Sequence, residues 1–529
     1  MTETADVVVA GAGHNSLITA AYLARAGHRV IVLDSRPVPG GGAVTEELLG
    51  PGYAIDSCST GHTLIQVNPV LADDELGLLS EQGLEYLVPD PFAHVAFPDG
   101  RQLTAWMERA RTVEEIARFS AADAAGYERL LDDYDEVKHV FSAAQFTPIG
   151  FGPPLEQRLR EHPRGGVWLR RAAMSAYDVI RHEFEDPHVQ AFLLWQAYQT
   201  LVPVDAAGTG VNAISIVFGR QRRSWTIPRG GSGRLTDALV RCVSDHGGTV
   251  LCGRRVNRLL LQDGRCAGVE AETGERFEAR EAVVSTIHVK HLVEMAPAEA
   301  WGEDFLYGVA TFDVGVPAMA VYLATSAPPV FETPDGPRSA VSAGLAGWPQ
   351  ELVDFCRAMR DGRYAADPPW VLVATPTLCD PTRAPEGEHT VKLLSPNAYG
   401  FPERAEAQAD RQLERLRRHC PDFTPEVVLA RLVRGPEEIE AANEHMIHGT
   451  FHGGDRTHPQ SGALRPAPGW AQHRTPIPGL YQTGGTTHPG GSITGGPGRN
   501  AALVLLEDLG SSREEVAGER DGRTRAGSH

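Results

Sequence analysis

Residues 1–34 constrain the fold of this chain more than any other stretch, because they combine two apolar strands, a glycine turn and a helix. One apolar run ends at Ala10 and leads into Gly11-Ala12-Gly13, and a second apolar run ends at Asp34. We expect Gly11 to permit a sharp turn and Gly13 to let the backbone approach a pyrophosphate at the N-terminus of the next helix. Asp34 stands about 20 residues further on, where a carboxylate meets an adenosine ribose. The stretch predicts a βαβ dinucleotide-binding unit; the alternative is a βαβ unit whose glycines serve packing alone.

A second glycine loop follows the acid. Asp34-Ser35-Arg36 leads to Gly40-Gly41-Gly42 and then to Ala43-Val44-Thr45. We expect this loop to let the chain pass along an extended dinucleotide, with Arg36 near its ribose and phosphates. The loop resembles the second FAD-binding motif of the amine oxidase and phytoene desaturase superfamily, and an NAD-dependent dehydrogenase has no need of it. The two motifs together predict FAD, and the alternative for the second motif is a plain Pro/Gly turn.

Composition restricts the partners of the protein. The chain has 529 residues, 42% of them apolar and 22% charged, and a formal net charge of -19. Its length suits two or three domains. The acidic balance argues against a nucleic-acid partner and disfavours electrostatic docking on anionic lipid, although peripheral membrane contact stays open. No run of 18 apolar residues occurs, so no transmembrane helix is predicted.

The N-terminus and the cysteines indicate a reducing compartment. The chain enters its first strand without a basic and then apolar leader, so we expect no secretory signal. The cysteine count is odd, at seven, and no two cysteines are spaced as C-x-x-C. This pattern favours a cytoplasmic protein and argues against a redox-active disulfide.

The order of strand-like and helix-like stretches predicts an α/β protein with two discontinuous domains. One is a Rossmann-type FAD-binding domain with an inserted β-meander, and the other is an α+β substrate domain of the amine oxidase or phytoene desaturase kind. The predicted FAD-binding domain comprises residues 1–72, 224–299 and 465–510, and the predicted substrate domain comprises residues 73–223 and 300–464. The polar residues 511–529 predict a disordered tail.

A Gly-rich segment near the C-terminus predicts that the chain returns to the cofactor. A short strand over Leu480–Thr483 precedes a loop that contains His488-Pro489-Gly490-Gly491-Ser492, and a helix is predicted from Pro497 to about Leu509. We expect the glycines to let the backbone lie against the flavin ring. The N-terminus of the helix is expected to stabilise negative charge on the reduced ring.

Seven stretches together resemble the FAD-dependent phytoene desaturase and carotenoid isomerase family, and most of all its branch of pyridine nucleotide-disulfide oxidoreductase domain-containing proteins. They are Gly11-Ala12-Gly13-His14-Asn15, Gly40–Glu47, Pro228-Arg229-Gly230-Gly231, Asp380-Pro381 with Ala384-Pro385, Phe451-His452-Gly453, Leu464-Arg465-Pro466 and Thr487–Gly491. The resemblance spans nearly the whole chain. The sequence departs from the family pattern at Ser16, Gly42 and Ser492, where we expect Gly, Ala and Gly, and none of these changes threatens FAD binding.

The resemblance implies FAD in a Rossmann-type domain, with an apolar substrate tunnel at the flavin. Known members remove hydride equivalents from carbon–carbon bonds or isomerise polyenes, and their substrate specificity does not transfer. Carried over to this sequence, the resemblance implies FAD contacts from Gly11, Gly13, His14, Asn15, Asp34, Ser35, Arg36, Gly41, Gly42, Ala43, Val44, Val256, Gly485, Ser492, Ile493 and Thr494. The identity of the largely apolar small-molecule substrate and the oligomeric state stay open.

Histidines are the candidates for accepting the proton that leaves with the hydride. His488, in the loop before the C-terminal helix, is the predicted catalytic residue, with a structural role in a tight turn as the alternative. His62 and His452 are second-rank candidates. No metal is predicted, because no zinc spacing occurs among His445, His448, His452 and His458.

Three functions remain open on the sequence alone. The first is an FAD-dependent desaturase or oxidase acting on a largely apolar metabolite. The second is a flavin amine oxidase acting on C–N bonds, which aromatic residues packed against the flavin would favour. The third is a non-catalytic, FAD-stabilised binding protein. The glycine loop at residues 228–235 follows no apolar strand, so only one dinucleotide fingerprint is present. We therefore expect electrons to pass to oxygen or another acceptor, without rapid reduction of the flavin by NAD(P)H.

Overall fold

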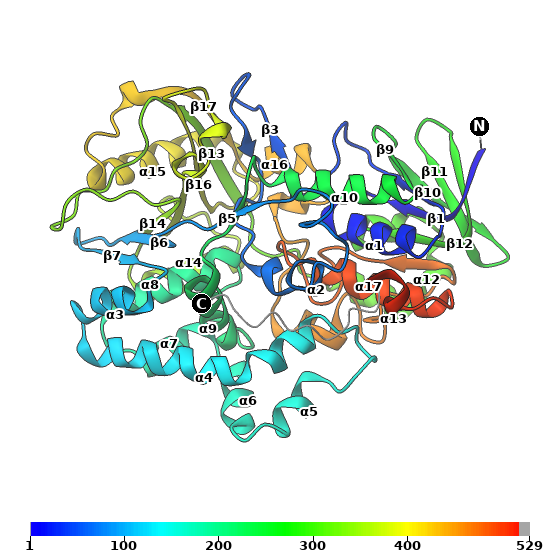
Figure 1. Cartoon of the computed structure of the whole chain (residues 1–529), viewed down its shortest axis with the longest axis horizontal. Coiled ribbons are helices and arrows are strands. Elements are labelled where there is room, and N and C mark those ends of the chain that lie inside the picture. The colour runs from blue at the N-terminus through cyan, green and yellow to red at the C-terminus, as the bar shows by residue number, and fades with distance from the viewer. Residues whose placement is uncertain (1, 518–529) are drawn as a thin grey trace.

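The computed structural model describes residues 2–517, which form two lobes, each built on a large β-sheet (Figure 1). Within these residues each large sheet has seven strands. The first sheet runs in the spatial order β10 (Val256–Gln262), β11 (Arg265–Ala271), β12 (Arg276–Ser285), β1 (Thr2–Ala10), β2 (Val30–Leu33) and β9 (Thr249–Leu251), with β18 (Leu480–Gln482) beside β12. The second runs in the order β17 (Val428–Arg434), β13 (Ala318–Thr325), β16 (His389–Pro396), β15 (Trp370–Ala374), β14 (Ser342–Ala346), β6 (Ala93–Ala96) and β7 (Gln102–Ala105).

The centre of the first sheet is the predicted βαβ unit. Strand β1 pairs in parallel with both β2 and β12, and its residues Val7, Val8 and Val9 are fully buried, as expected of a strand covered on both faces. Helix α1 (His14–Arg25) connects β1 to β2, and α10 (Gly233–Asp245) and α17 (Gly496–Asp508) pack beside it on the same face. Short helices cover the other face, namely α11 (Val289–Leu292), α12 (Ala298–Trp301) and α13 (Glu303–Ala310).

The predicted β-meander is present as β10, β11 and β12. Adjacent strands of the three are antiparallel, and β12 also pairs in parallel with β1 and β18. The meander is therefore an extension of the first sheet. All strands of this sheet come from the three segments predicted for the FAD-binding domain; the boundaries of the two domains remain a prediction.

The second sheet packs one face against a group of helices, which lie below it in Figure 1, and the other face against α15 (Ala405–His419). The helices below it are α3 (Arg109–Ala117), α4 (Ala121–Gln145), α6 (Gly165–Ala173), α7 (Ala176–Glu183), α8 (Pro187–Ala197), α9 (Gly210–Arg223) and α14 (Pro349–Arg360). Side-chain caps mark the N-termini of two of these helices. The Ser120 side chain accepts a hydrogen bond from Asp123 N (3.1 Å) at the start of α4, and Asp186 caps α8 before Pro187. Residues 73–223 are mainly helical, as expected, but they also add β6 and β7 to the edge of the sheet.

Smaller elements complete the chain. These are β3 (Thr45–Glu46) with β4 (Ile55–Asp56), β5 (Tyr86–Leu87) with β8 (Ile227–Pro228), α2 (Pro69–Ala72), α5 (Leu155–Arg160), α16 (Pro436–Ala442) and α18 (Arg513–Ala517). Helix α18 lies within the predicted disordered tail, and its Val516 is buried against the core around α1 and α17; the extent of the tail remains a prediction. Residues 518–529 of that predicted tail lie outside the described residues.

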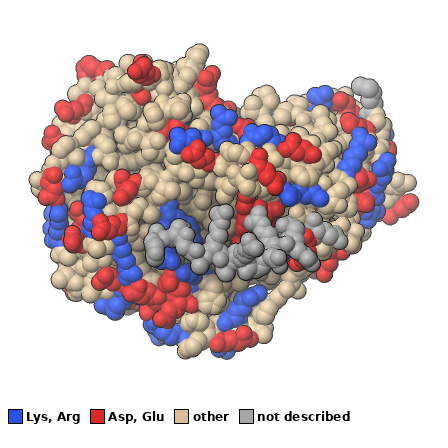
Figure 2. Space-filling view, viewed as in Figure 1, with Lys and Arg blue, Asp and Glu red and all other residues tan. Residues whose placement is uncertain are grey.

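Two surface observations bear on the expected partners. On the face shown in Figure 2, Asp and Glu side chains are interspersed with Lys and Arg. None of the helices over residues 2–517 is both long enough and apolar enough to cross a membrane.

Candidate active site

A cavity of about 1140 Å³ lies between the two lobes of the chain. The ends of β1, β2 and β12 line one part of it through Gly11, Asp34 and Thr286. The other part, which we name the inner chamber, is lined by residues of the segments 58–64, 199–225, 372–394 and 451–452. The cavity thus extends from the C-terminal edge of a parallel sheet, where nucleotides bind in such folds, to the inner chamber.

The glycine turn after β1 forms the expected cradle. Gly11 has φ +99°, and a Cβ there would lie 2.3 Å from the Thr286 side chain, so the turn requires glycine. Gly13 pairs with Gly40 of the second loop, and a Cβ on Gly41 would lie 3.2 Å from the Gly13 Cα. No side chain caps α1 and its first turn carries no acid. Its N–H groups are therefore open to an anion in the cavity.

Asp34 and Arg36 lie beside this cradle. The Asp34 carboxylate accepts hydrogen bonds from Ala12 N (2.7 Å) and Arg36 N (2.9 Å), and it still lines the cavity. The Arg36 side chain donates to Gly41 O (3.3 Å). A fixed carboxylate with free lone pairs, a guanidinium and open helix N–H groups match the ribose and pyrophosphate of FAD. The residues present therefore fit this cofactor.

The three departures from the family pattern have local explanations. The Ser16 hydroxyl donates within the turn, to Gly11 O (2.6 Å) and Gly13 O (2.9 Å). A Cβ on Gly42 would be 3.5 Å from Cys58 Sγ, an ordinary contact, so alanine also fits there. Ser492 adopts φ +75°, the left-handed conformation that a glycine would adopt without strain, and its hydroxyl lies 3.1 Å from His452 Nδ1.

The C-terminal Gly-rich loop closes the cavity against residues 451–454. A Cβ would lie 1.9 Å from His452 O at Gly491 and 2.6 Å from the same oxygen at Gly485. These glycines therefore serve close approach of two backbone segments. Among the residues predicted to contact FAD, the cavity is lined by Gly11, Gly13, His14, Asn15, Asp34, Ser35, Arg36, Gly41, Gly42, Val256, Gly485, Ser492 and Ile493.

Three predicted cofactor residues, Ala43, Val44 and Thr494, are not among the described residues that line the cavity. Ala43 is fully buried, and its carbonyl accepts a hydrogen bond from the Thr236 hydroxyl of α10 (2.7 Å). Val44 is also buried. Thr494 faces the protein, because its carbonyl accepts from Asn68 Nδ2 (2.8 Å) and its hydroxyl from Gly496 N (3.2 Å). In this structure they pack around the site, and their contact with FAD remains a prediction.

His488, the predicted catalytic residue, also lies away from the cavity lining of the described chain. Its Nε2 donates to Ala144 O in the last turn of α4 (3.1 Å). The next two carbonyls of that helix end accept hydrogen bonds from Asn500 (Gln145 O, 3.1 Å) and Arg499 (Phe146 O, 3.0 Å). His488 therefore belongs to a set of side chains that caps the C-terminus of α4. Its position supports the structural alternative, and the general-base assignment remains a prediction.

The start of α17 differs from the expectation in a related way. Gly496 N donates to the Thr494 hydroxyl and Gly498 N donates to Asn15 Oδ1 (3.2 Å). A Cβ on Gly498 would lie 2.3 Å from Asn15 O, so α17 packs tightly on α1. The first N–H groups of α17 are thus used within the protein, and none of residues 494–508 lines the cavity.

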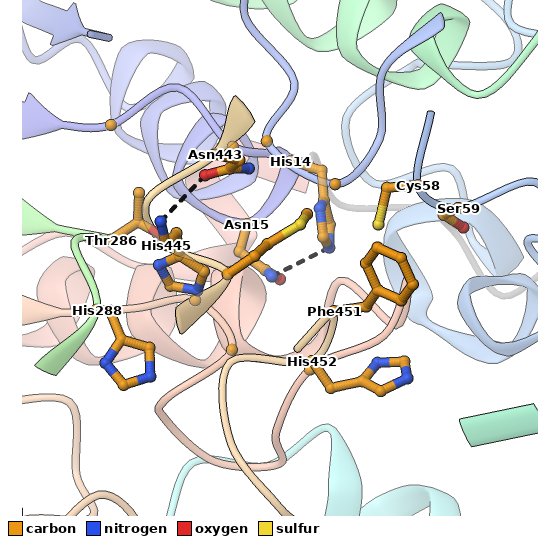
Figure 3. Close-up of a pocket in the computed structure, with 18 of the residues that line it drawn as sticks. His14, Asn15, Cys58, Ser59, Thr286, His288, Asn443, His445, Phe451 and His452 are labelled. Atoms are coloured by element: carbon orange, nitrogen blue, oxygen red, sulfur yellow. Dashed lines mark hydrogen bonds between the residues drawn. The ribbon is translucent and has the colours of Figure 1, made fainter. Parts of the chain in front are cut away.

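Four histidines that line the cavity are neutral at pH 7; His14 and His288 are buried, and His445 and His452 are half-buried. In Figure 3, His288 and His445 lie on the left of the view, and His14 and His452 lie on the right. Desolvation lowers the pKa of His14 and His445 to about 4 and that of His452 to about 3, and it also holds the pKa of His288 well below its usual value. Within residues 2–517 no group of three or more His, Cys, Asp or Glu is arranged to hold a metal ion.

Of the second-rank candidates, only His452 lines the cavity. His62 is fully buried, with Nε2 2.7 Å from the Ser232 hydroxyl and Nδ1 3.1 Å from the Tyr86 hydroxyl. It therefore joins α10 to β5 and has a structural role. His452 keeps one ring nitrogen free of any hydrogen bond within the described chain, since only Nδ1 has a partner, the hydroxyl of Ser492.

Two buried cations of the inner chamber escaped the sequence analysis. Arg220 on α9 and Lys392 on β16 both line it, alongside the aromatic side chains of Trp225 and Phe451. Lys392 Nζ donates to Asp56 O (3.1 Å), Cys58 O (2.6 Å) and the Thr60 hydroxyl (2.8 Å). The one sign of Lys392 in the sequence was a lysine inside an apolar strand. The sequence contains no sign that Arg220 is buried, because the neighbouring residues Arg222 and Arg223 are also arginines.

Comparison with known proteins agrees with this geometry. Residues 17–496 match the family model of flavin containing amine oxidoreductases. The chain is 28% identical to a limonene dehydrogenase component of Castellaniella defragrans, over 96% of this chain and 95% of that protein. It is 26% identical to mouse pyridine nucleotide-disulfide oxidoreductase domain-containing protein 2 (95% and 94%) and 27% identical to a lycopene-forming phytoene desaturase of Pantoea ananas (95% and 99%). The resemblance stated from the motifs is therefore confirmed.

A solved structure supports the fold. A triple mutant of putrescine oxidase aligns with a TM-score of 0.60 at 16% identity, covering 96% of this chain and 100% of that one. At this level of identity the similarity establishes the architecture alone. It confirms the predicted α/β fold with a substrate domain.

Proposed function

Because this chain belongs to the family of flavin containing amine oxidoreductases and is an FAD-dependent oxidoreductase, we propose that it dehydrogenates a carbon–carbon bond of a largely apolar small molecule that carries no amine. The similarity to a phytoene desaturase and to a component of a limonene dehydrogenase supports this choice. The names of these relatives do not identify the substrate of this chain.

The residues proposed to hold FAD are those that line the first part of the cavity. Gly13, Gly41 and the N-terminus of α1 would accept the pyrophosphate, and Asp34 would accept the ribose hydroxyls. When bound, FAD supplies the two-electron chemistry that takes up a hydride from the substrate. The protein contributes binding, orientation and exclusion of water.

The charge of the inner chamber is the observation that carries the proposal. Arg220 and Lys392 are its charged side chains, and no Asp or Glu is among the described residues that line it. Most aliphatic amines are protonated near pH 7, so two buried cations without a carboxylate disfavour their entry. Leu201, Leu372 and Phe451 on the same walls favour an apolar body. An amine-free substrate meets both conditions.

His452 is the proton acceptor in this proposal. Dehydrogenation removes a hydride from one carbon and a proton from its neighbour, which leaves a carbon–carbon double bond. The pKa of His452, lowered to about 3 by burial, keeps the ring neutral through the physiological range, so a ring nitrogen with a lone pair is available. The low pKa also lets the protonated ring release its proton readily to solvent.

Oxygen or another acceptor is proposed to reoxidise the cofactor. The chain has one dinucleotide fingerprint, and its seven cysteines are free thiols, so no disulfide is present to relay electrons from NAD(P)H. We expect anaerobic mixing with NADPH to leave the flavin oxidised on the timescale of turnover. Fast bleaching by NADPH would contradict this assignment.

Amine oxidation is the second candidate. The observation that favours it is the aromatic pair Trp225 and Phe451 on the chamber wall, because aromatic walls next to a flavin suit an amine side chain. The positive charge of the inner chamber disfavours a protonated amine and therefore favours the first candidate.

Product analysis separates the two candidates. The purified protein is incubated aerobically with limonene, phytoene and apolar carboxylic acids, and in parallel with putrescine and cyclohexylamine. The proposal predicts products that have lost two hydrogens from amine-free compounds and no aldehyde or ketone from the amines. Turnover of an amine with release of ammonia would replace it with the second candidate.

A further inference from the structure

We infer that the substrate carries a carboxylate, which the Arg220 guanidinium binds in the inner chamber. The inference rests on the proposed function, because it adds a head group to the apolar, amine-free substrate proposed above. It starts from a buried cation that the protein itself leaves without an acidic partner.

Arg220 is 4% exposed, and no carboxylate of the described residues forms an ion pair with it. Its NH1 donates to the Gln196 side-chain oxygen and its NH2 to that of Gln199. Burial alone lowers its pKa, to about 9, with no nearby charge contributing. A buried cation is costly unless it is paired. Two neutral amides hold the group in place and leave its charge uncompensated.

Other buried arginines of the chain show the contrast. Arg383 pairs with Asp56 at 2.8 Å and Arg499 with Glu75 at 2.7 Å. Arg465, which has no acidic partner, donates to backbone carbonyls of Gly454, Asp455, Gln460 and Gly485 and so fixes a loop. Arg220 differs from all three, since it combines a missing acid with a place on a cavity wall.

The donor count of Arg220 suits a carboxylate. A guanidinium has five N–H donors, and the two glutamines take two of them. The remaining donors permit the bidentate contact that arginine makes with carboxylates. Gln196 and Gln199 act as positioning residues, because their side-chain oxygens fix the plane of the guanidinium.

Lys392 adds charge to the same chamber without competing for the contact. Its three N–H groups are all used, by Asp56 O, Cys58 O and the Thr60 hydroxyl. The neighbouring Asp56 carboxylate is neutralised by Arg383, and burial raises the pKa of the Cys58 thiol to about 12, so it is uncharged. Lys392 and Arg383 thus share the single carboxylate of Asp56, and the group keeps one net positive charge, which favours an anion nearby.

The rest of the chamber defines the other end of the ligand. Leu201, Ile216, Trp225, Leu372, Leu394 and Phe451 line it with apolar surface. An apolar chain or ring system with one carboxylate satisfies both the walls and the cations. A pure hydrocarbon would leave the charge of Arg220 and the net charge around Lys392 uncompensated.

Binding measurements test this without turnover. Decanoate and methyl decanoate are titrated into the FAD-loaded protein, and binding is followed by the shift of the flavin absorbance and by calorimetry. We expect decanoate to bind about tenfold more tightly than the ester, the minimum for a charge-assisted hydrogen bond. Arg220→Gln should remove that preference and leave ester binding unchanged, and Arg220→Lys should restore part of it.

Arg222→Gln is the matched control. Arg222 lies on the same helix, is 58% exposed and faces Asp135 at 3.8 Å, so its loss should leave both affinities unchanged. The inference is overturned if Arg220→Gln binds decanoate as wild type does, if acid and ester weaken equally, or if the variant loses FAD, which would assign Arg220 to the cofactor. Flavin reduction is scored separately: a protein that prefers decanoate but dehydrogenates nothing refutes the proposed function and keeps the carboxylate site.

Discussion

At the scale of single residues, the role of some positions can be predicted from the local sequence, whereas the role of others depends on distant parts of the fold. Gly11 was predictable, because the turn restricts its residue type locally; Gly13 was predicted from the close approach of a ligand, since the fold itself tolerates a side chain there. The role of His488 was not predictable, because its direction is decided by α4, an element far away in the chain. The sequence pattern of a histidine in a Gly-rich loop is identical whether the side chain faces a cavity or caps a helix. In this structure His488 donates to Ala144 O.

Replacing His488 with alanine tests this reassignment. The change leaves the Ala144 carbonyl without its donor, so the free energy of unfolding should fall by about 1–3 kcal/mol. FAD content and the rate of anaerobic flavin reduction should stay at the wild-type level. His452→Ala is the comparison, and it should slow flavin reduction by about a hundredfold with FAD retained. A slow reduction in His488→Ala, with normal stability, would restore the original catalytic assignment.

At the scale of elements, periodicity and turn residues predicted the strands and helices around the cofactor well. The strand β1, the turn and α1 form one local unit, and the meander β10–β12 carries its own turn signals at Asp263-Gly264 and Thr273-Gly274. Strands β6 and β7 were missed within a mainly helical stretch, because only pairing with β14 makes them part of a sheet. Lys392 was missed for a similar reason, since its partners come from residues 56–60.

Gly13→Val tests the unit formed by the glycine turn and α1. A Cβ at Gly13 meets nothing closer than the Ser16 hydroxyl at 4.0 Å, so the fold tolerates a side chain there. The valine would instead occupy the space proposed for the pyrophosphate. We expect a folded protein with an unchanged circular dichroism spectrum that retains no FAD after gel filtration. Full flavin occupancy in this variant would show that the pyrophosphate lies elsewhere.

At the scale of the whole molecule, two sheets meet around one cavity and bury many neutral histidines. Burial lowers the pKa of His62, His452 and His473 to about 3 and of His94 and His488 to about 4. An unfolded histidine titrates near 6.5. Between about pH 6.5 and 4 the unfolded chain therefore binds more protons than the folded one, and stability falls as the pH falls.

Urea unfolding at pH 7 and pH 5 checks this direction. The midpoint should drop on acidification, and His94→Gln should reduce the drop. His94 lies in the second sheet, hydrogen-bonded to Thr104 (3.0 Å) and Gln102 (2.8 Å), away from the cavity. Removing one such histidine should lower the pH slope by up to about 1.4 kcal/mol per pH unit. An unfolding midpoint that stays constant between the two pH values would refute the linkage.

The proposed function depends above all on which compounds reduce the flavin. The most direct measurement is anaerobic mixing of the FAD-loaded protein with a panel of apolar, amine-free compounds and a matched panel of amines, while the visible flavin absorbance is recorded. We expect bleaching by at least one amine-free compound, with a carbon–carbon double bond in the product, and no bleaching by any amine. Bleaching by amines alone would contradict the proposed function.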